Sequence, residues 1–228
     1  MKEIMITYLM MGLSGVSTFL LLFFRKKKYG ISWFNLVVIL VVIGVVGYYG
    51  AAGATYLADG VWPGIRFYGK VLFVTISLWI FSKILKLNCS QLMDYYAPVD
   101  IFALVVMKIN CLRFGCCAGI EVCLSAGGCF YFPSQIVELL VALVIFALLM
   151  ALEFLDKCNG YRYSLYLICY GLTRFVLDAL REDRGRVFNF FDLSVSVAQL
   201  FCIVLVCLGI ANICFVKKQK AIVKMPNS

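Results

Sequence analysis

Long apolar runs recur along the whole chain and are separated by short polar connections. Runs of about 18 residues or more with few charges are typical of transmembrane helices, because polar faces and turns would interrupt a globular core. The pattern predicts membrane spans at residues 4–24, 31–54, 67–87, 95–107, 133–155, 163–180 and 193–216. We therefore predict an all-α, polytopic membrane helix bundle of about seven transmembrane helices, with residues 1–228 forming a single integral membrane domain.

The fourth predicted span, residues 95–107, is the shortest. A helix of this length rises only ~20 Å, whereas the hydrocarbon core of a bilayer is ~30 Å thick. We expect this segment either to be extended by its flanks or to be partly re-entrant and covered by protein.

Composition and charge support a membrane protein. Hydrophobic residues make up 64% of the chain and charged residues only 14%, against ~25% charged residues in a soluble domain. A net charge of +9 is compatible with nucleic-acid binding, but the Lys and Arg residues lie at the ends of apolar runs, where they contact lipid headgroups. We therefore expect membrane lipids as contacts and no nucleic acid. The first run lacks a small-residue cleavage site, which predicts a retained helix rather than a removable signal peptide.

The distribution of Lys and Arg predicts the topology. With the N-terminus external and the C-terminus cytoplasmic, twelve cations lie inside and eight outside, as the positive-inside rule favours. Apart from Lys2, the external cations fall in three connections, at residues 66–70, 108–113 and 181–186. Cations retained against this bias indicate either that the three connections have a function or that the opposite topology applies.

The sixth run carries charges on one helical face. Arg174 and Asp178 are four residues apart and Arg181 follows three residues later, so the three side chains share a face. Arg174 and Asp178 would pair, which lowers the cost of each in lipid and gives a purely structural interpretation. Arg181 adds a second guanidinium without an obvious partner. Two guanidinium groups on one face suit the phosphate of a phospholipid headgroup.

The fifth run begins Pro133, Ser134, Gln135, as a helix start does. Proline fits the first turn, and Ser134 and Gln135 could satisfy free backbone donors. A helix start does not explain Glu138, which lies about one turn further into the apolar run. Its carboxylate needs a partner, such as a cation of one of the loops.

Six motifs follow one another in an order that resembles a known family. They are Phe67-Tyr68-Gly69, Asp94-Tyr95-Tyr96-Ala97-Pro98, Lys108-Ile109-Asn110-Cys111 with Gly115 and Gly119, Pro133-Ser134-Gln135-Ile136-Val137-Glu138, Tyr170-Gly171-Leu172-Thr173-Arg174-Phe175 with Asp178 and Arg181, and Gln199. Over nearly the whole chain this order resembles the prolipoprotein diacylglyceryl transferase family. The resemblance implies a seven-helix enzyme of the bacterial cell (inner or plasma) membrane with an external N-terminus, in agreement with the charge distribution.

Enzymes of this family transfer the diacylglyceryl group of phosphatidylglycerol to the lipobox cysteine thiol of an exported prolipoprotein. For this chemistry we hypothesise that Arg174 and Arg181 hold the phosphate with help from Lys108 and that Asp178 orients Arg174. Tyr68 or a substrate-bound water would handle the thiol proton. The expected catalytic residues are therefore Tyr68, Lys108, Arg174, Asp178 and Arg181. The expected phospholipid-binding residues are Lys108, Gln135, Glu138, Arg174 and Arg181. We expect no cofactor.

The chain departs from the family pattern at positions that matter for catalysis. Lys108 stands at an arginine position. Lysine keeps the positive charge but lacks the planar guanidinium group, which can bind two oxygens at once and is called the fork below. Cys111 stands at an asparagine position and Tyr68 at a histidine position. Tyrosine is a poor base unless a cation lowers its pKa, for which Lys70 and Lys108 are the candidates. The connection before Pro133 is also short. Together these departures make an altered acceptor a second interpretation.

The cysteines form two groups. Six lie in or near apolar runs, where cysteine acts as a small hydrophobic residue: Cys89, Cys158, Cys169, Cys202, Cys207 and Cys214. Five lie in one loop: Cys111, Cys116, Cys117, Cys123 and Cys129. The loop could hold disulfides on an oxidising external face, free thiols, or a reactive thiol whose pKa Lys108 and Arg113 lower. Without histidine or a Cys-x-x-Cys pair the spacing disfavours a metal.

Two alternative functions remain open at the level of sequence. The first is a non-catalytic relative that keeps the phospholipid pocket for binding. The second is a membrane thiol oxidoreductase that uses the loop from Cys111 to Cys129.

Overall fold

The computed structural model describes residues 2–62, 65–123, 128–190 and 193–224. These residues form seven helices, α1 (Lys2–Arg25), α2 (Trp33–Asp59), α3 (Phe67–Ile84), α4 (Cys89–Phe114), α5 (Ser134–Phe154), α6 (Arg162–Ala179) and α7 (Val197–Lys224). Two antiparallel hairpins lie in the connections: β1 (Glu121–Cys123) pairs with β2 (Cys129–Tyr131), and β3 (Val187–Phe190) pairs with β4 (Leu193–Ser196). The predicted all-α bundle is confirmed.

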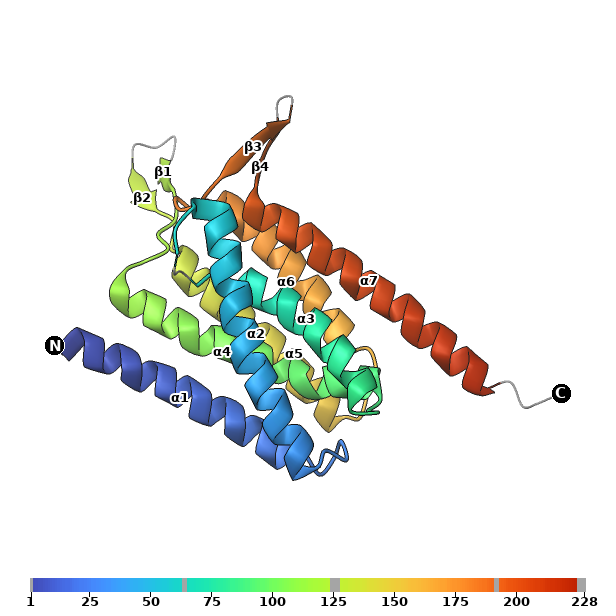
Figure 1. Ribbon diagram of the computed structural model, residues 1–228. Coiled ribbons are helices and arrows are strands. Elements are labelled where there is room, and N and C mark those ends of the chain that lie inside the picture. The colour runs from blue at the N-terminus through green and yellow to red at the C-terminus, as the bar shows by residue number, and fades with distance from the viewer. Residues whose placement is uncertain (1, 63–64, 124–127, 191–192, 225–228) are drawn as a thin grey trace.

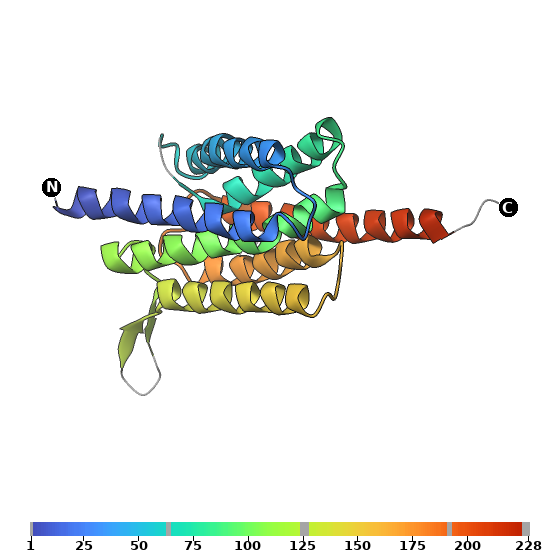
Figure 2. The ribbon, with the colours of Figure 1, turned by 90° about the horizontal axis from the view of Figure 1, so that it is seen from below.

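The helices lie alongside one another, with the two termini at opposite ends of the bundle (Figures 1 and 2). Figure 2 shows the β1–β2 hairpin at the end that carries the N-terminus. Helix α4 is central, because it packs against α1, α3, α5 and α6. Outside α4, the most extensive helix–helix contacts join α6 to α7 and α2 to α3.

Helix α4 extends the predicted fourth span, residues 95–107, at both ends, which is the first of the two expected alternatives. It has 26 residues, enough to rise ~39 Å. The side chain of Asn88 accepts the backbone N–H of Gln91 at 3.3 Å and so caps its start, and Gly115, with φ +64°, ends it. Hydropathy underestimated the helix because its ionisable residues, such as Asp100 and Lys108, are buried against other helices rather than facing lipid.

The last helix starts later than predicted. It begins at Val197 rather than at residue 193, because residues 193–196 form strand β4 and pair with β3. The backbone there satisfies its hydrogen bonds across the hairpin before the helix begins.

The protein is a membrane protein. Four helical segments in the described part of the chain are long and apolar enough to cross a bilayer: Trp33–Asp59, Phe67–Ile84, Ser134–Phe154 and Val197–Ala221. Large apolar side chains on their outer surfaces are exposed, among them Val41, Val144 and Ile203, as lipid contact requires. Helices α4 and α6 carry more charges and pack against each other inside the bundle.

Helices α2 and α3 approach closely at Gly69. A Cβ atom there would lie 2.3 Å from Cβ of Ala54 and 2.4 Å from the carbonyl oxygen of Gly50. Small residues at a helix contact allow this approach in membranes. The contact fixes the start of α3, including Tyr68, against α2.

We expect Gly69→Ala to lower the free energy of unfolding by about 1–3 kcal/mol, because the added methyl group overpacks the α2–α3 contact. Thermal unfolding in detergent measures the effect. Gly44→Ala is the matched control, since nothing lies within 4 Å of a Cβ atom at that helical position. Equal unfolding midpoints for the two variants would contradict the close approach.

A buried ion pair connects helices at the end of the bundle that lies away from the hairpins. Nε of Arg25 lies 3.0 Å from both carboxylate oxygens of Glu153, and its Nη1 donates to the carbonyl of Tyr95 at 2.5 Å. Arg162 lies 3.9 Å from the same carboxylate. Glu153 therefore links α1, α5 and the start of α6 at the end away from the hairpins.

Candidate active site

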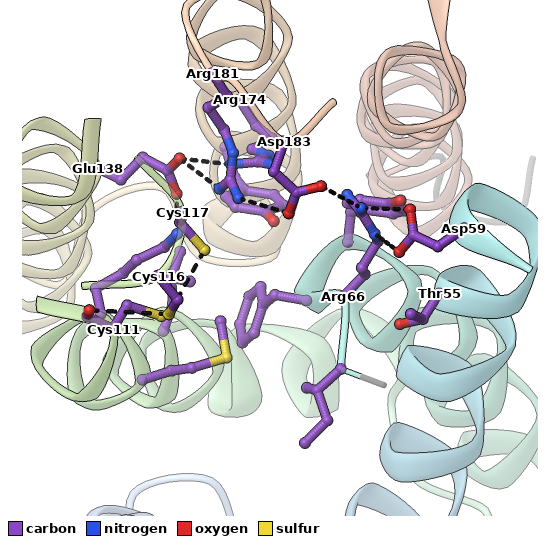
Figure 3. Close-up of a pocket in the computed structure, with 17 residues that line it drawn as sticks. Thr55, Asp59, Arg66, Cys111, Cys116, Cys117, Glu138, Arg174, Arg181 and Asp183 are labelled. Atoms are coloured by element: carbon purple, nitrogen blue, oxygen red, sulfur yellow. Dashed lines mark hydrogen bonds and ion pairs between the residues drawn. The ribbon is translucent and has the colours of Figure 1, made fainter. Parts of the chain in front are cut away.

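A cavity of about 350 Å³ lies at the end of the bundle that carries the hairpins (Figure 3). Its walls come from the end of α2, the start of α3, the end of α4 and the loop after it, the start of α5, and the end of α6 with the segment that follows. The three connections predicted to carry functional cations each contribute one, Arg66, Lys108 and Arg181. Sequence-distant cations therefore meet at a single site.

Glu138 is the centre of a buried cation cluster. Its Oε1 lies 2.6 Å from Nη1 of Arg174 and 3.0 Å from Nη1 of Arg181, and its Oε2 pairs with Nζ of Lys108. All four side chains are buried. The predicted cationic partner of Glu138 is thus confirmed, although Lys108 and Arg174 lie in helices rather than in loops.

The expected pairing in α6 is confirmed, but the expected isolation of Arg181 is wrong. Nη2 of Arg174 lies 3.2 Å from Oδ1 of Asp178, whose Oδ2 accepts the hydroxyl of Ser196 at 2.5 Å. Arg181 has two acidic neighbours, Glu138 and, at 3.8 Å, Asp183. The packing of α5 against α6 supplies the first of these, which helical periodicity within α6 could not reveal.

The cavity is consequently close to neutral rather than strongly positive. Four cations and three carboxylates line it, which leaves one positive charge in excess: Arg66, Lys108, Arg174 and Arg181 against Asp59, Glu138 and Asp183. Nη2 of Arg66 lies 2.7 Å from Asp59 and 3.2 Å from Asp183. Asp59 and Asp183 were not predicted as site residues from the sequence, although the cations that they contact, Arg66 and Arg181, were singled out there.

Tyr68 lines the cavity with a buried hydroxyl that has no hydrogen-bond partner among the described residues. Nε of Arg181 is a second such atom. Buried polar atoms are normally hydrogen-bonded, so two orphaned atoms on the wall of one cavity fit a polar ligand. The lysines predicted to activate Tyr68 have other partners: Lys70 lies 2.8 Å from Asp100, and Lys108 pairs with Glu138.

Ser134 and Gln135 do not cap helix α5 as predicted. The hydroxyl of Ser134 donates to the carbonyl of Cys117 at 2.5 Å, and the amide of Gln135 donates to the carbonyl of Cys116 at 2.6 Å. The residue before α5, Pro133, makes no side-chain capping bond. The two side chains instead hold the cysteine loop over the start of α5, because that loop lies across the helix end.

Backbone pairing places the cysteine loop against Arg181. Gly119 forms a bridge with Arg181, and the N–H of Ile120 donates to the carbonyl of Leu180 at 3.1 Å. A Cβ atom at Gly119 would lie 2.2 Å from the carbonyl oxygen of Phe132. Only glycine fits this crossing, which brings the thiol of Cys117 beside the guanidinium.

The five loop cysteines divide into a disulfide and a thiol cluster. Cys123 and Cys129 form a disulfide across the β1–β2 hairpin, which confirms the disulfide interpretation for this pair. Cys111, Cys116 and Cys117 are free and line the cavity.

Among these thiols Cys117 is the most acidic. A hydrogen bond from Cys111 and the charges of Arg181 and Lys108 lower the pKa of Cys117 to about 5, although burial acts in the opposite direction. Of the three thiols, Cys117 is therefore the one whose deprotonation the neighbouring cations favour most.

A family model described as prolipoprotein diacylglyceryl transferase matches residues 5–215. The chain belongs to the prolipoprotein diacylglyceryl transferase family. A relative from Chlorobaculum tepidum named phosphatidylglycerol–prolipoprotein diacylglyceryl transferase is 26% identical over 166 residues, which are 68% of this chain and 57% of the relative. Relatives of the same name from Dehalococcoides mccartyi and Mannheimia succiniciproducens are 24% and 27% identical over 64% and 72% of this chain, and over 59% and 65% of their own lengths. This chain spans about three fifths of the length of these relatives.

The motifs that carry the family resemblance lie in two places, at the cavity and at the opposite end of the bundle. Tyr68, Lys108, Glu138, Arg174 and Arg181 all line the cavity. The Asp94 motif lies at the opposite end, where the carboxylate of Asp94 accepts the backbone N–H groups of Gly160 at 2.5 Å and Tyr163 at 3.0 Å. In this family member Asp94 therefore holds the start of α6, the helix that carries Arg174.

Proposed function

We propose that this protein transfers the diacylglyceryl group of phosphatidylglycerol to a cysteine thiol of an exported lipoprotein precursor. The observation that carries the proposal is the cluster of Lys108, Arg174 and Arg181 around Glu138 on the wall of a cavity within a membrane bundle of this family. Three cations fit a phosphodiester headgroup. The names of the relatives supply the substrate class.

Charge development explains the need for these cations. The acceptor sulfur forms a bond to the glyceryl carbon, the bond from that carbon to the phosphate oxygen breaks, and glycerol phosphate leaves with one more negative charge than the bound diester. Arg174 and Arg181, assisted by Lys108, stabilise this charge in a low-dielectric site. Glu138 holds all three cations in place before substrate arrives, and Asp178 orients Arg174, so little reorganisation is needed during the reaction.

The acceptor thiol must lose its proton before or during attack. The hydroxyl of Tyr68 is buried, unpartnered in the described structure and on the cavity wall. In the proposed mechanism it hydrogen-bonds the thiol or a substrate-bound water that carries the proton away. Gln135 acts indirectly, since it holds the loop that carries Cys116 and Cys117.

We further infer that the chain is one membrane domain of the bacterial cell membrane with an external N-terminus and a cytoplasmic C-terminus. The Lys and Arg distribution supports this orientation. The cavity lies at the end of the bundle that carries the N-terminus (Figure 2), so this orientation places the site on the face where an exported precursor arrives.

Incubation of purified protein with phosphatidylglycerol and a lipobox peptide tests the proposal. We expect a peptide mass increase of one diacylglyceryl group and stoichiometric release of glycerol phosphate. A peptide with serine in place of its cysteine is the control and should stay unmodified. Bound phosphatidylglycerol without adduct or released glycerol phosphate would instead establish the non-catalytic binding alternative, and reversible loss of thiols without adduct would establish the oxidoreductase.

A further inference from the structure

Three free thiols converge on one wall of the cavity. Cys111 lies in the last turn of α4, and Cys116 and Cys117 follow directly after the left-handed Gly115. The sulfur atoms of the three residues lie within 4.8 Å of one another (Figure 3). Family chemistry at this cavity has no use for three thiols of the enzyme, because the thiol that reacts belongs to the acceptor.

The separations fit a single ion. A thiolate lies about 2.3 Å from a bound Zn²⁺, so three sulfurs in a trigonal arrangement lie about 4.0 Å apart. Sγ of Cys116 and Sγ of Cys117 are 4.0 Å apart. Small side-chain rotations would bring the third sulfur to the same distance, since all three are already within 4.8 Å.

The surrounding charge favours a metal–thiolate complex. Three thiolates around a monovalent or divalent cation keep a net negative charge, which nearby cationic side chains stabilise. Lys108 and Arg181 supply this positive charge, because both line the same cavity as the three thiols. The all-sulfur ligand set selects soft ions over Mg²⁺ or Ca²⁺.

We propose that Cys111, Cys116 and Cys117 form a binding site for one soft, thiophilic metal ion of the Cu(I) or Zn²⁺ class on the wall of the cavity. A trigonal thiolate set satisfies Cu(I), whereas Zn²⁺ would keep a fourth position for another ligand. The site requires three deprotonated sulfurs and no oxidant, so binding releases the thiol protons to solvent. This inference goes beyond lipid transfer and does not depend on it.

Metal titration of the full-length protein in detergent under anaerobic, reducing conditions tests the site. Cd²⁺ is the spectroscopic probe, read from its thiolate charge-transfer absorption, and Zn²⁺ and Cu(I) are then added as competitors. We expect one Cd²⁺ per chain, displaced by both competitors. Cys116→Ser and Cys117→Ser should each weaken binding at least about tenfold, because each removes one of three ligands.

Two controls separate this site from other cysteines. Cys214→Ser changes an exposed cysteine of α7, and the double variant Cys123→Ser and Cys129→Ser removes the hairpin cysteines; both should bind Cd²⁺ as the parent protein does. Thermal unfolding of every variant shows that each is folded. Unchanged affinity in folded Cys116→Ser and Cys117→Ser, or a disulfide among the three thiols in the isolated protein, would overturn the proposal. No phosphatidylglycerol is present, so failure of transfer leaves this result unaffected.

Discussion

Replacing Arg181 with alanine is expected to lower the rate of diacylglyceryl transfer from phosphatidylglycerol by about 10²–10³-fold, the usual cost of losing one group that stabilises developing charge. Arg181 is one of the three cations around Glu138, and its Nε has no partner in the described structure. A phosphate oxygen of the substrate would accept a hydrogen bond from this N–H group. The loss should appear mainly in kcat, because the leaving phosphate gains its extra charge only as the bond to carbon breaks.

Two variants make the Arg181 test specific. Arg181→Lys keeps the charge and loses the fork, so its rate should fall between those of the parent and the alanine variant. Lys218→Ala removes an exposed cation of α7 near the opposite end of the bundle and should transfer at the parent rate. Thermal unfolding confirms that the variants are folded. Parent-level turnover in Arg181→Ala would exclude this residue from the site.

Removal of the Glu153 carboxylate is expected to cause the largest loss of stability. Glu153→Ala leaves Arg25 and Arg162 buried without the anion that they share. Breaking a buried ion pair by removing one partner costs about 3–5 kcal/mol. We therefore expect a marked fall in the midpoint of thermal unfolding in detergent.

The position of Glu153 allows stability and activity to be separated. It lies at the end of the bundle away from the cavity, so the folded variant should still transfer at low temperature. Glu182→Ala, which removes an exposed carboxylate, should change the unfolding free energy by no more than about 0.5 kcal/mol. A Glu153→Ala variant as stable as Glu182→Ala would show that the buried pair contributes nothing to the fold.

Local patterning was enough to predict the bundle and part of the site. Apolar runs of membrane-spanning length predicted the helices, because a bilayer imposes a minimum length and hydrophobicity on each span. The spacing of Arg174, Asp178 and Arg181 predicted a shared face, and Glu138 was recognised as a buried charge in need of a cation. These inferences use only neighbours within one element, where helical geometry fixes the distances.

Packing between elements decided the rest. The hydropathy pattern did not reveal the full length of α4, because the charged residues of this helix face other helices. The pairing of Lys70 with Asp100 and of Arg181 with Glu138 joins residues far apart in the chain, whose distances depend on how helices cross. The same holds for the three thiols, since Gly115 and the Gly119 crossing bring Cys116 and Cys117 back to α4. Sequence spacing disfavoured a metal there, whereas the folded backbone places the three sulfurs within reach of one ion.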